Sequence, residues 1–178
     1  MARRRGRSCR RLVAARIIGG PLAPNIRGWA YFTPAAGGSW VSVRVSGLPE
    51  YMPATNSRPP IGPHGLHIHL YGTCAVGNPA DPFLAAGEHW NPDNQLHGNH
   101  AGDLPVLFSN DGVAKMRVFT NRFRPNQVVG KSIIIHMYPD DYRTQPTGAS
   151  GPRLACGVIK NYRICGNRIS PKPPTSCC

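Results

Sequence analysis

The sequence predicts an all-β domain, folded as an antiparallel sandwich or barrel with Greek-key connections. Two observations favour this class. The 178 residues include 20 glycines and 19 prolines, which indicates many turns and loops rather than long helices. Apolar and polar residues alternate in several short segments, whereas no segment sustains the apolar stripe of a helix. This length is enough for one domain with a sizeable core.

The individual strands are predicted from this alternation. Residues 40–46, Trp-Val-Ser-Val-Arg-Val-Ser, alternate almost perfectly and predict a strand with one buried face. The segments 27–32, 114–119 and 131–135 predict further strands. Residues 65–70 predict another strand, in which the polar positions are histidines.

His67 and His69 make that strand the most informative part of the chain. Successive side chains of a strand point to opposite faces, so both imidazoles emerge on one side. Leu66, Ile68 and Leu70 emerge on the other side, where a core can bury them. Two imidazoles fixed in this way form half of a metal site. The alternative is a pair of ordinary exposed strand histidines, which are common.

The remaining metal ligands are predicted downstream. Four more histidines and a carboxylate lie in three segments, and only His64 is left over: His89 in residues 87–92, His97, His100 and Asp103 in residues 97–103, and His136 after the apolar run 133–135. Imidazole suits copper and zinc, and a carboxylate added to imidazoles is a common zinc set. Because no Cys-x-x-Cys pattern competes for the metal, a nitrogen-rich site is predicted.

Four separated segments resemble the copper/zinc superoxide dismutases of the bacterial type. They are Gly65–His69, Gly87–Pro92, His100–Leu104 and Gly151–Ile159, in the order of that family. The resemblance covers roughly residues 13–160 and is specific, because four segments must agree in residue type and in order. It implies a barrel of about eight strands with long metal-binding and active-site loops, oxidoreductase activity on superoxide, and copper and zinc as cofactors.

The resemblance also implies the metal ligands. Copper is held by His67, His69, His89 and His136, and zinc by His89, His97, His100 and Asp103, so that the His89 imidazolate bridges both metals. Asp140 matches the carboxylate that ties a copper-ligand histidine to a zinc-ligand histidine. The alternative is that Asp140, like Asp141, is a loop carboxylate beside a turn.

Two further roles are implied by the resemblance. Arg153 stands at the active-site arginine, which attracts a small anion; the alternative is a surface arginine at a strand start. Cys74 and Cys156 match the intrasubunit disulfide; the alternative is two reduced thiols in a cytosolic chain. Cys9, Cys165, Cys177 and Cys178 have no family counterpart, and the adjacent pair Cys177-Cys178 binds a soft metal, cross-links chains or has no role.

The implied mechanism is a two-step redox cycle. One superoxide reduces Cu(II) and leaves as dioxygen, and a second oxidises Cu(I) and leaves as hydrogen peroxide after taking up two protons. Zinc does not shuttle an electron, but it holds the bridging His89, which gives a proton to the peroxide. Superoxide is thus the implied substrate, and a homodimer is compatible with the resemblance.

The sequence departs from eukaryotic members in the metal-binding loops. Only two residues separate His97 from His100, so the zinc loop is much shorter and zinc occupancy is less firmly predicted than copper occupancy. The segment between His136 and Arg153 is also short and lacks the cluster of acidic residues and lysine found in those members.

Charge divides the chain into three predicted parts: a basic disordered tail at 1–12, the dismutase domain at 13–160, and a Pro- and Cys-containing tail at 161–178. Nine of the 13 net positive charges lie in the two tails, which contain no acidic residue. The arginines of residues 3–7 suit contact with nucleic acid or an anionic surface, but such a run is more often a solvated terminus.

The cellular location stays open between the cytoplasm and the cell envelope. A signal peptide is poorly supported, because Arg16 interrupts the apolar run that starts at Leu12. No segment approaches the length of a membrane span.

Two other classes of function compete with a dismutase. A metal carrier on the same barrel, such as the dismutase-like domain of a chaperone, is disfavoured because the four implied copper ligands and Arg153 are all present. A basic surface-binding protein is supported by the tails alone. A dismutase stays active without residues 1–12, whereas a tail-driven binder loses its function.

Overall fold

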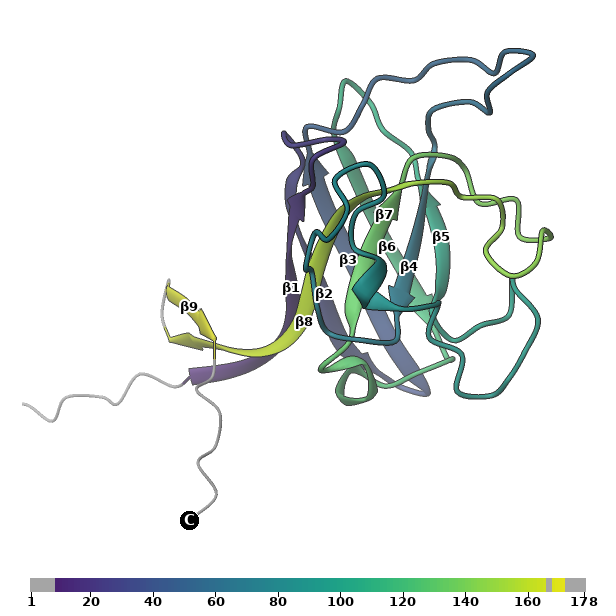
Figure 1. The fold of residues 1–178 in the computed structure, drawn as a ribbon. Helices are drawn as coiled ribbons and strands as arrows, with labels where there is room; N and C mark the ends of the chain where they lie inside the picture. Colours follow the sequence, from purple (N-terminus) through teal and green to yellow (C-terminus); the bar gives the residue numbers. More distant parts are fainter. Residues whose placement is uncertain (1–8, 166–167, 172–178) are drawn as a thin grey trace, which may run out of the picture.

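The computed structural model describes residues 9–165 and 168–171. Nine strands and two short 3-10 helices make up the fold, which confirms the all-β prediction (Figure 1). The strands are β1 (Cys9–Gly19), β2 (Arg27–Ala35), β3 (Gly38–Ser46), β4 (His64–His69), β5 (Asp103–Leu107), β6 (Ala114–Thr120), β7 (Ser132–His136), β8 (Arg153–Cys165) and β9 (Arg168–Pro171). The 3-10 helices are η1 (Leu84–Ala86) and η2 (Pro125–Val128).

The strands form a nearly closed antiparallel barrel. Their order is β5-β4-β7-β8-β1-β2-β3-β6, with β9 beside β8. The two ends of this order, β5 and β6, lie in contact. Strands β3 and β4 follow one another in the sequence but not in the sheet, as do β6 and β7, so the chain crosses the barrel twice between hairpins.

The core fills the barrel through the predicted alternation. In β3, Val41, Val43 and Val45 are buried inside, whereas Arg44 and Ser46 are exposed outside. In β4 and β7, Leu66, Ile68, Ile133 and Ile135 belong to the same core. His67 and His69 therefore lie on the outer surface of the barrel wall, beneath the loops that cover it.

Leu70 does not join this core, contrary to the prediction. Strand β4 ends at His69, and the Leu70 amide donates to the Glu88 carbonyl over 3.0 Å. The chain has already turned away from the barrel, and Leu70 is 40% exposed.

Strand pairing extends past the predicted domain boundaries at residues 12 and 160. Strand β1 begins at Cys9, and it pairs with β8 as far as Cys165, opposite Cys9. Strand β9 then pairs back onto β8. The arginines at 3–7 and the pair Cys177-Cys178 lie outside the described residues. Within the part of the chain that is described, no helix has the length and apolar character needed to cross a membrane.

Candidate metal centre

Three adjacent strands, β5, β4 and β7, and one loop bring the predicted ligands together. In the β4–β7 pairing, His67 lies opposite Ile134 and His69 opposite Ser132, and His136 ends β7. The loop from η1 to β5 then folds back over β4, where the backbone of His89 forms an isolated antiparallel β-bridge with that of His69.

Gly102 allows this loop to lie so close to β4. The Ile68 amide donates to the Gly102 carbonyl over 2.9 Å, and the Gly102 amide donates to the Trp90 carbonyl over 2.9 Å. A Cβ atom at Gly102 would collide with the Ile68 carbonyl oxygen. Because Gly102 has no side chain, both arms of the loop can lie against the strand that carries His67 and His69.

The first group of ligand atoms, here called the strand set, consists of His67, His69, His89 and His136. One nitrogen from each lies within 4.8 Å of the others, and all four residues are buried. The Nε2 atoms of His69 and His136 are 3.3 Å apart, and the His67 and His89 rings stack with centroids 3.8 Å apart.

The second group, the loop set, consists of His89, His97, His100 and Asp103, and its ligand atoms also lie within 4.8 Å of one another. Asp103 Oδ1 is 3.0 Å from His89 Nδ1 and 3.4 Å from His100 Nδ1. Its Oδ2 atom lies 3.3 Å from His97 Nδ1 and accepts from the Gly98 and His100 amides. The two sets share only His89.

The imidazoles of both sets are oriented toward a cation. Four of the buried nitrogens have no hydrogen-bond partner: His67 Nδ1, His89 Nε2, His97 Nδ1 and His100 Nδ1. The outer nitrogens of the strand set are bonded instead, since His69 Nδ1 donates to Gly87 and His136 Nδ1 donates to Gly151. Buried polar atoms are rarely left unpaired, so the orphaned nitrogens fit metal ions at both sets.

Asp140 joins the two sets from behind. Its Oδ2 atom accepts from His67 Nε2 over 2.7 Å, and its Oδ1 atom accepts from His97 Nε2 over 2.8 Å. The carboxylate is buried. Gly148 makes this contact possible, because a Cβ atom there would collide with both Asp140 and His97, and its φ of +65° suits glycine. Asp141 is exposed and caps only its own turn, at the amides of Arg143 and Thr144.

Burial keeps His67, His69 and His136 of the strand set neutral. Desolvation lowers the pKa of His67 and His69 well below the ordinary value, and lowers the pKa of His136 to about 3. For Asp103, desolvation alone would raise the pKa, but the His89 hydrogen bond and the neighbouring histidines outweigh it and lower the pKa. Neutral imidazoles and an ionised carboxylate are the forms that bind metal.

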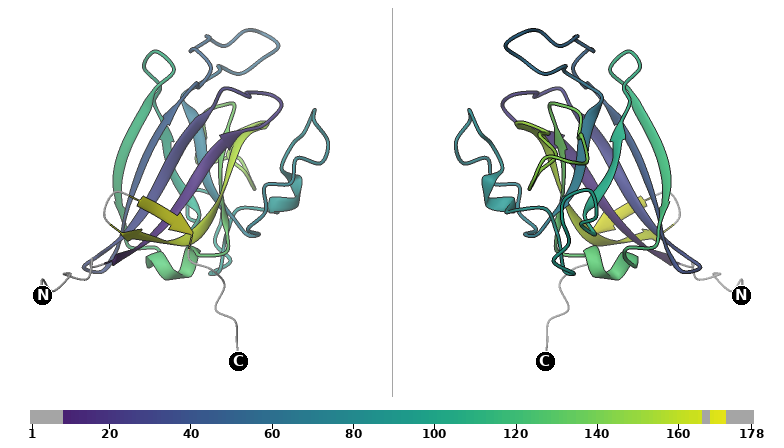
Figure 2. Two further views of the ribbon diagram at one scale, coloured as in Figure 1. Left: turned by 90° about the vertical axis from the view of Figure 1, so that its left-hand side faces the viewer. Right: turned by 90° about the vertical axis from the view of Figure 1, so that its right-hand side faces the viewer.

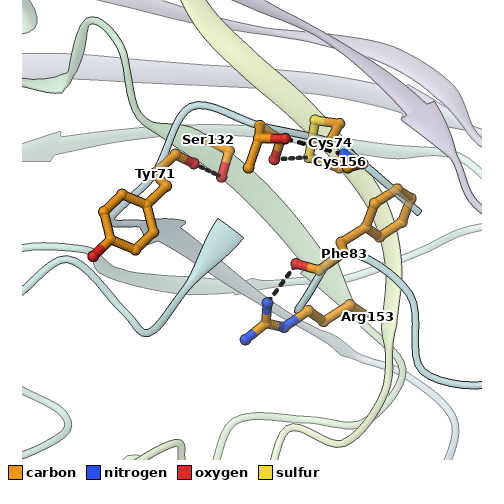
Figure 3. The surroundings of a disulfide bond; sticks show 8 residues. Tyr71, Cys74, Phe83, Ser132, Arg153 and Cys156 are labelled. Carbon is orange, nitrogen blue, oxygen red and sulfur yellow. Dashed lines mark hydrogen bonds between the residues drawn. A yellow bond between two sulfur atoms is a disulfide. The ribbon is translucent and has the colours of Figure 1, made fainter. Parts of the chain in front are cut away.

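Arg153 faces the strand set and is held by the loop that the disulfide fixes. Its guanidinium donates to the Phe83 carbonyl over 2.6 Å (Figure 3). It also donates to the Gly87 carbonyl over 2.8 Å. The Gly87 oxygen is also the one that orients His69. Cys74 and Cys156 form the predicted disulfide, which ties this loop to β8 with Cα atoms 5.6 Å apart.

Three residues at this centre were not predicted from the sequence. His64 is fully buried, and its Nδ1 atom donates to the His136 carbonyl over 2.9 Å. Arg122 donates to the His100 and Gly98 carbonyls over 3.0 and 3.1 Å. Gln145 accepts from the His97 amide over 2.8 Å. The spacing His64-x-x-His67 is a local sequence signal for His64. Arg122 and Gln145 belong to no local sequence pattern.

Comparison with known proteins agrees with this geometry. Residues 26–159 match the sequence model of the family described as copper/zinc superoxide dismutase (SODC). A "Superoxide dismutase [Cu-Zn]" of Deinococcus radiodurans is 40% identical over 153 residues, which cover 76% of this chain and 78% of that protein. One from Francisella tularensis subsp. holarctica is 40% identical over 107 residues, covering 54% of this chain and 55% of that protein.

A solved structure extends the likeness to the fold. The Cu/Zn superoxide dismutase from Brucella abortus superposes with a TM-score of 0.67 at 29% identity, covering 86% of this chain and all of that one. The chain therefore belongs to the copper/zinc superoxide dismutase family, whose members are oxidoreductases that dismutate superoxide with copper and zinc as cofactors.

Proposed function

We propose that this chain converts superoxide to dioxygen and hydrogen peroxide at the strand set, with copper held by His67, His69, His89 and His136. The loop set of His89, His97, His100 and Asp103 would hold zinc. The observation that carries this proposal is the position of His89, whose Nε2 atom belongs to the strand set and whose Nδ1 atom meets Asp103 in the loop set. Bound copper supplies the one-electron transfer that oxidises one superoxide and reduces the next.

The residues around the copper set have separate tasks. Arg153 offers a fixed positive charge and hydrogen-bond donors to a small anion, because two backbone carbonyls hold its guanidinium in place. His89 Nε2 would hold a proton for the peroxide in the state in which copper does not occupy that nitrogen. Asp140 fixes the tautomers of His67 and His97 by accepting their Nε2 protons.

A metal carrier is the second candidate, since the two sets alone would suit storage or delivery. The anchored Arg153 favours the enzyme, because a carrier has no use for an anion-attracting guanidinium beside its metal. We also propose that the chain forms a homodimer, which sedimentation of the metal-loaded chain at several concentrations tests separately.

The decisive experiment loads the metal-free chain with copper, with zinc, or with both, and measures metal content and superoxide decay on each sample. We expect full turnover with both metals, weaker turnover with copper alone, and none with zinc alone. A chain that binds both metals stoichiometrically but shows no turnover would be a carrier. Full turnover with zinc alone would refute the copper assignment.

A further inference from the structure

The outer surface of the sheet on the side of β1 and β2 combines arginines with aromatic rings. We call it the basic-aromatic face, and the left view of Figure 2 looks onto these strands. It is defined by Arg16 of β1, Trp29 and Tyr31 of β2, Arg44 of β3, and Lys115 and Arg117 of β6. All four basic residues are exposed, and both aromatic residues are half-buried. None of these residues belongs to the metal centre.

Strand register places these residues in ordered rows. Arg16 lies opposite Trp29, Trp29 opposite Arg44, and Arg44 opposite Lys115, so that one row crosses four strands. At a strand spacing of about 4.8 Å, this row is about 14 Å wide. The adjacent row on the same face contains Tyr31 and, two strands away, Arg117.

The positive charge of this face is not neutralised by an ion pair among the described residues. All eight acidic residues lie between Glu50 and Asp141, so β1, β2, β3, β6 and β8 contain none. Asp111, in the turn before β6, comes closest to these strands along the sequence. Across residues 9–164, no ion pair involves an arginine or a lysine. Arg44 and Lys115 even lie directly opposite each other, a like-charge pair that destabilises a sheet unless an anion is bound between them.

The aromatic rings of the face are arranged for stacking. Trp29 and Tyr31 have nearly parallel rings, 9° apart in plane with centroids at 6.0 Å. Beside them is a hollow of about 290 Å³ that is also lined by Arg27 and Arg44. Trp40, in contrast, is already covered by the Arg117 guanidinium at 4.6 Å from its ring centroid. Trp29 also packs edge-to-face against Tyr162 of β8, with ring centroids 5.5 Å apart. The stacking surface left for a base is therefore Tyr31 and the remaining surface of Trp29, beside Arg44.

We propose that the basic-aromatic face binds single-stranded nucleic acid. Arginine and lysine would contact the phosphates, and exposed bases would stack on Trp29 and Tyr31, which is the usual composition of such sites. A duplex fits less well, because its bases are stacked on one another and are not free for these rings. An anionic lipid surface would need the charges of the face but not the paired aromatic rings.

The test uses the full metal-loaded chain and a fluorescein-labelled oligothymidylate of about 20 nucleotides, which exceeds the usual site size of about 4–16 nucleotides. Fluorescence anisotropy should show saturable binding. The apparent affinity should fall with salt, with a log–log slope of about −0.7 for each phosphate contacted.

Three variants separate stacking from charge. Arg44→Ser with Lys115→Ser should weaken binding about tenfold and reduce the salt slope by about 1.4. Trp29→Ser should also weaken binding about tenfold with the salt slope unchanged, because it removes stacking alone. Trp29→Phe keeps a ring and should restore most of the affinity. Circular dichroism and superoxide decay should match the wild type for the charge variant, which keeps the proposal testable if Trp29→Ser folds poorly.

A matched control removes equal charge elsewhere. Arg58→Ser with Arg143→Ser lies on the loops after β3 and after β7, and should leave binding within about twofold of the wild type. A second control replaces Arg3, Arg4, Arg5 and Arg7 with serine.

Three outcomes overturn the proposal. Affinity that follows the tail control and ignores Arg44, Lys115 and Trp29 assigns binding to the N-terminal arginines. Equal losses in the matched control and the face variant mean that net charge alone is responsible. Phosphatidylglycerol vesicles that bind with the same dependence on Trp29 and Arg44, while oligothymidylate does not bind, identify a lipid surface instead.

Discussion

The strand set and the loop set of the metal centre share His89 but are held in place by different means. His67, His69 and His136 belong to β4 and β7, where backbone pairing and the core behind them fix each Cα atom. His97 and His100 belong to a loop without regular pairing, and side chains from elsewhere hold that loop. Three ligands of the strand set are therefore part of the barrel, whereas His97 and His100 of the loop set depend on individual long-range contacts. Asp103, the first residue of β5, is the one loop-set ligand on a strand.

This difference indicates how the two metals depend on the protein. Strand ligands remain nearly in place when the metal leaves, because the sheet does not need the metal to form. His97 and His100 have no strand pairing of their own, so zinc and the loop that carries them stabilise one another. The short spacing between His97 and His100 fits this interpretation, because Gln145 bonds the loop at His97 and Arg122 bonds it at His100.

Removing one ligand from each set should give the largest and most different effects. His136→Ala should lose copper and reduce superoxide decay by at least about a thousandfold, with zinc content retained, because the reacting metal is gone. Asp103→Ala should lose zinc and about 3–4 kcal/mol of stability in excess zinc, yet retain copper-dependent turnover. Metal analysis and calorimetry check both variants. Unchanged zinc stoichiometry in Asp103→Ala would show that the loop set does not hold the ion.

Substitutions of Arg153 test whether the guanidinium beside the strand set contributes to superoxide turnover. Arg153→Glu should slow turnover about ten- to a thousandfold at low ionic strength and weaken inhibition by small anions, with copper content intact. That range is the known scale of field focusing in clefts, for which superoxide dismutase is itself an example. Arg153→Lys should be milder, since it keeps the charge but loses the planar fork. A glutamate variant with wild-type rates at low salt would remove the guiding role.

His67, His69 and His136 should also dominate the pH dependence of the metal-free chain. Burial lowers the pKa values of His67, His69 and His136, so the folded state keeps them neutral while the unfolded chain takes up protons below about pH 6.5. The free energy of unfolding should therefore keep its full value above pH 6.5. Below that pH it should fall by about 1.4 kcal/mol per pH unit for each imidazole. Urea denaturation between pH 7 and pH 5 measures the slope. His136→Asn should reduce the slope of the unfolding free energy against pH by the equivalent of about one proton. A wild-type unfolding free energy that does not change between pH 7 and pH 5 would contradict the burial argument.

The sequence was most informative where the site follows backbone periodicity. Alternation in β4 placed His67 and His69 on one face, and the structure brings all seven predicted ligands into the two sets. Asp140 lies between His67 and His97 and accepts a hydrogen bond from each. Leu70 was wrongly assigned to the core, because alternation does not indicate where a strand ends.

The contacts that hold the loop set could not be predicted in the same way. Arg122 and Gln145 reach the loop from 22 and 48 residues away, and neither residue belongs to a motif. Gly148 is recognised only when the Asp140 carboxylate is seen beside it. Composition also indicated a tail up to residue 12, whereas pairing with β8 continues β1 back to Cys9. Such long-range packing is a property of the folded chain and not of any short segment.

Arg122 provides the smallest and most specific test of how the loop set is held. Its guanidinium donates to the carbonyls of Gly98, His100 and Asp103 and to the Asn99 side chain, so it fixes the short loop from beneath. Arg122→Gln should lower zinc affinity about tenfold, at the lower end of what such supporting contacts usually cost.

Copper affinity should change little in Arg122→Gln, because no strand ligand touches this side chain in the described residues. The matched control is Arg124→Gln, two residues away and equally exposed, whose guanidinium donates to Ala35 instead. Competition with a zinc-selective dye measures both variants at constant copper loading. If Arg124→Gln loses as much zinc affinity as Arg122→Gln, the effect comes from lost charge or general loosening of the β6–β7 loop. If Arg122→Gln alone weakens zinc binding, the loop set depends on a contact that the strand set does not need.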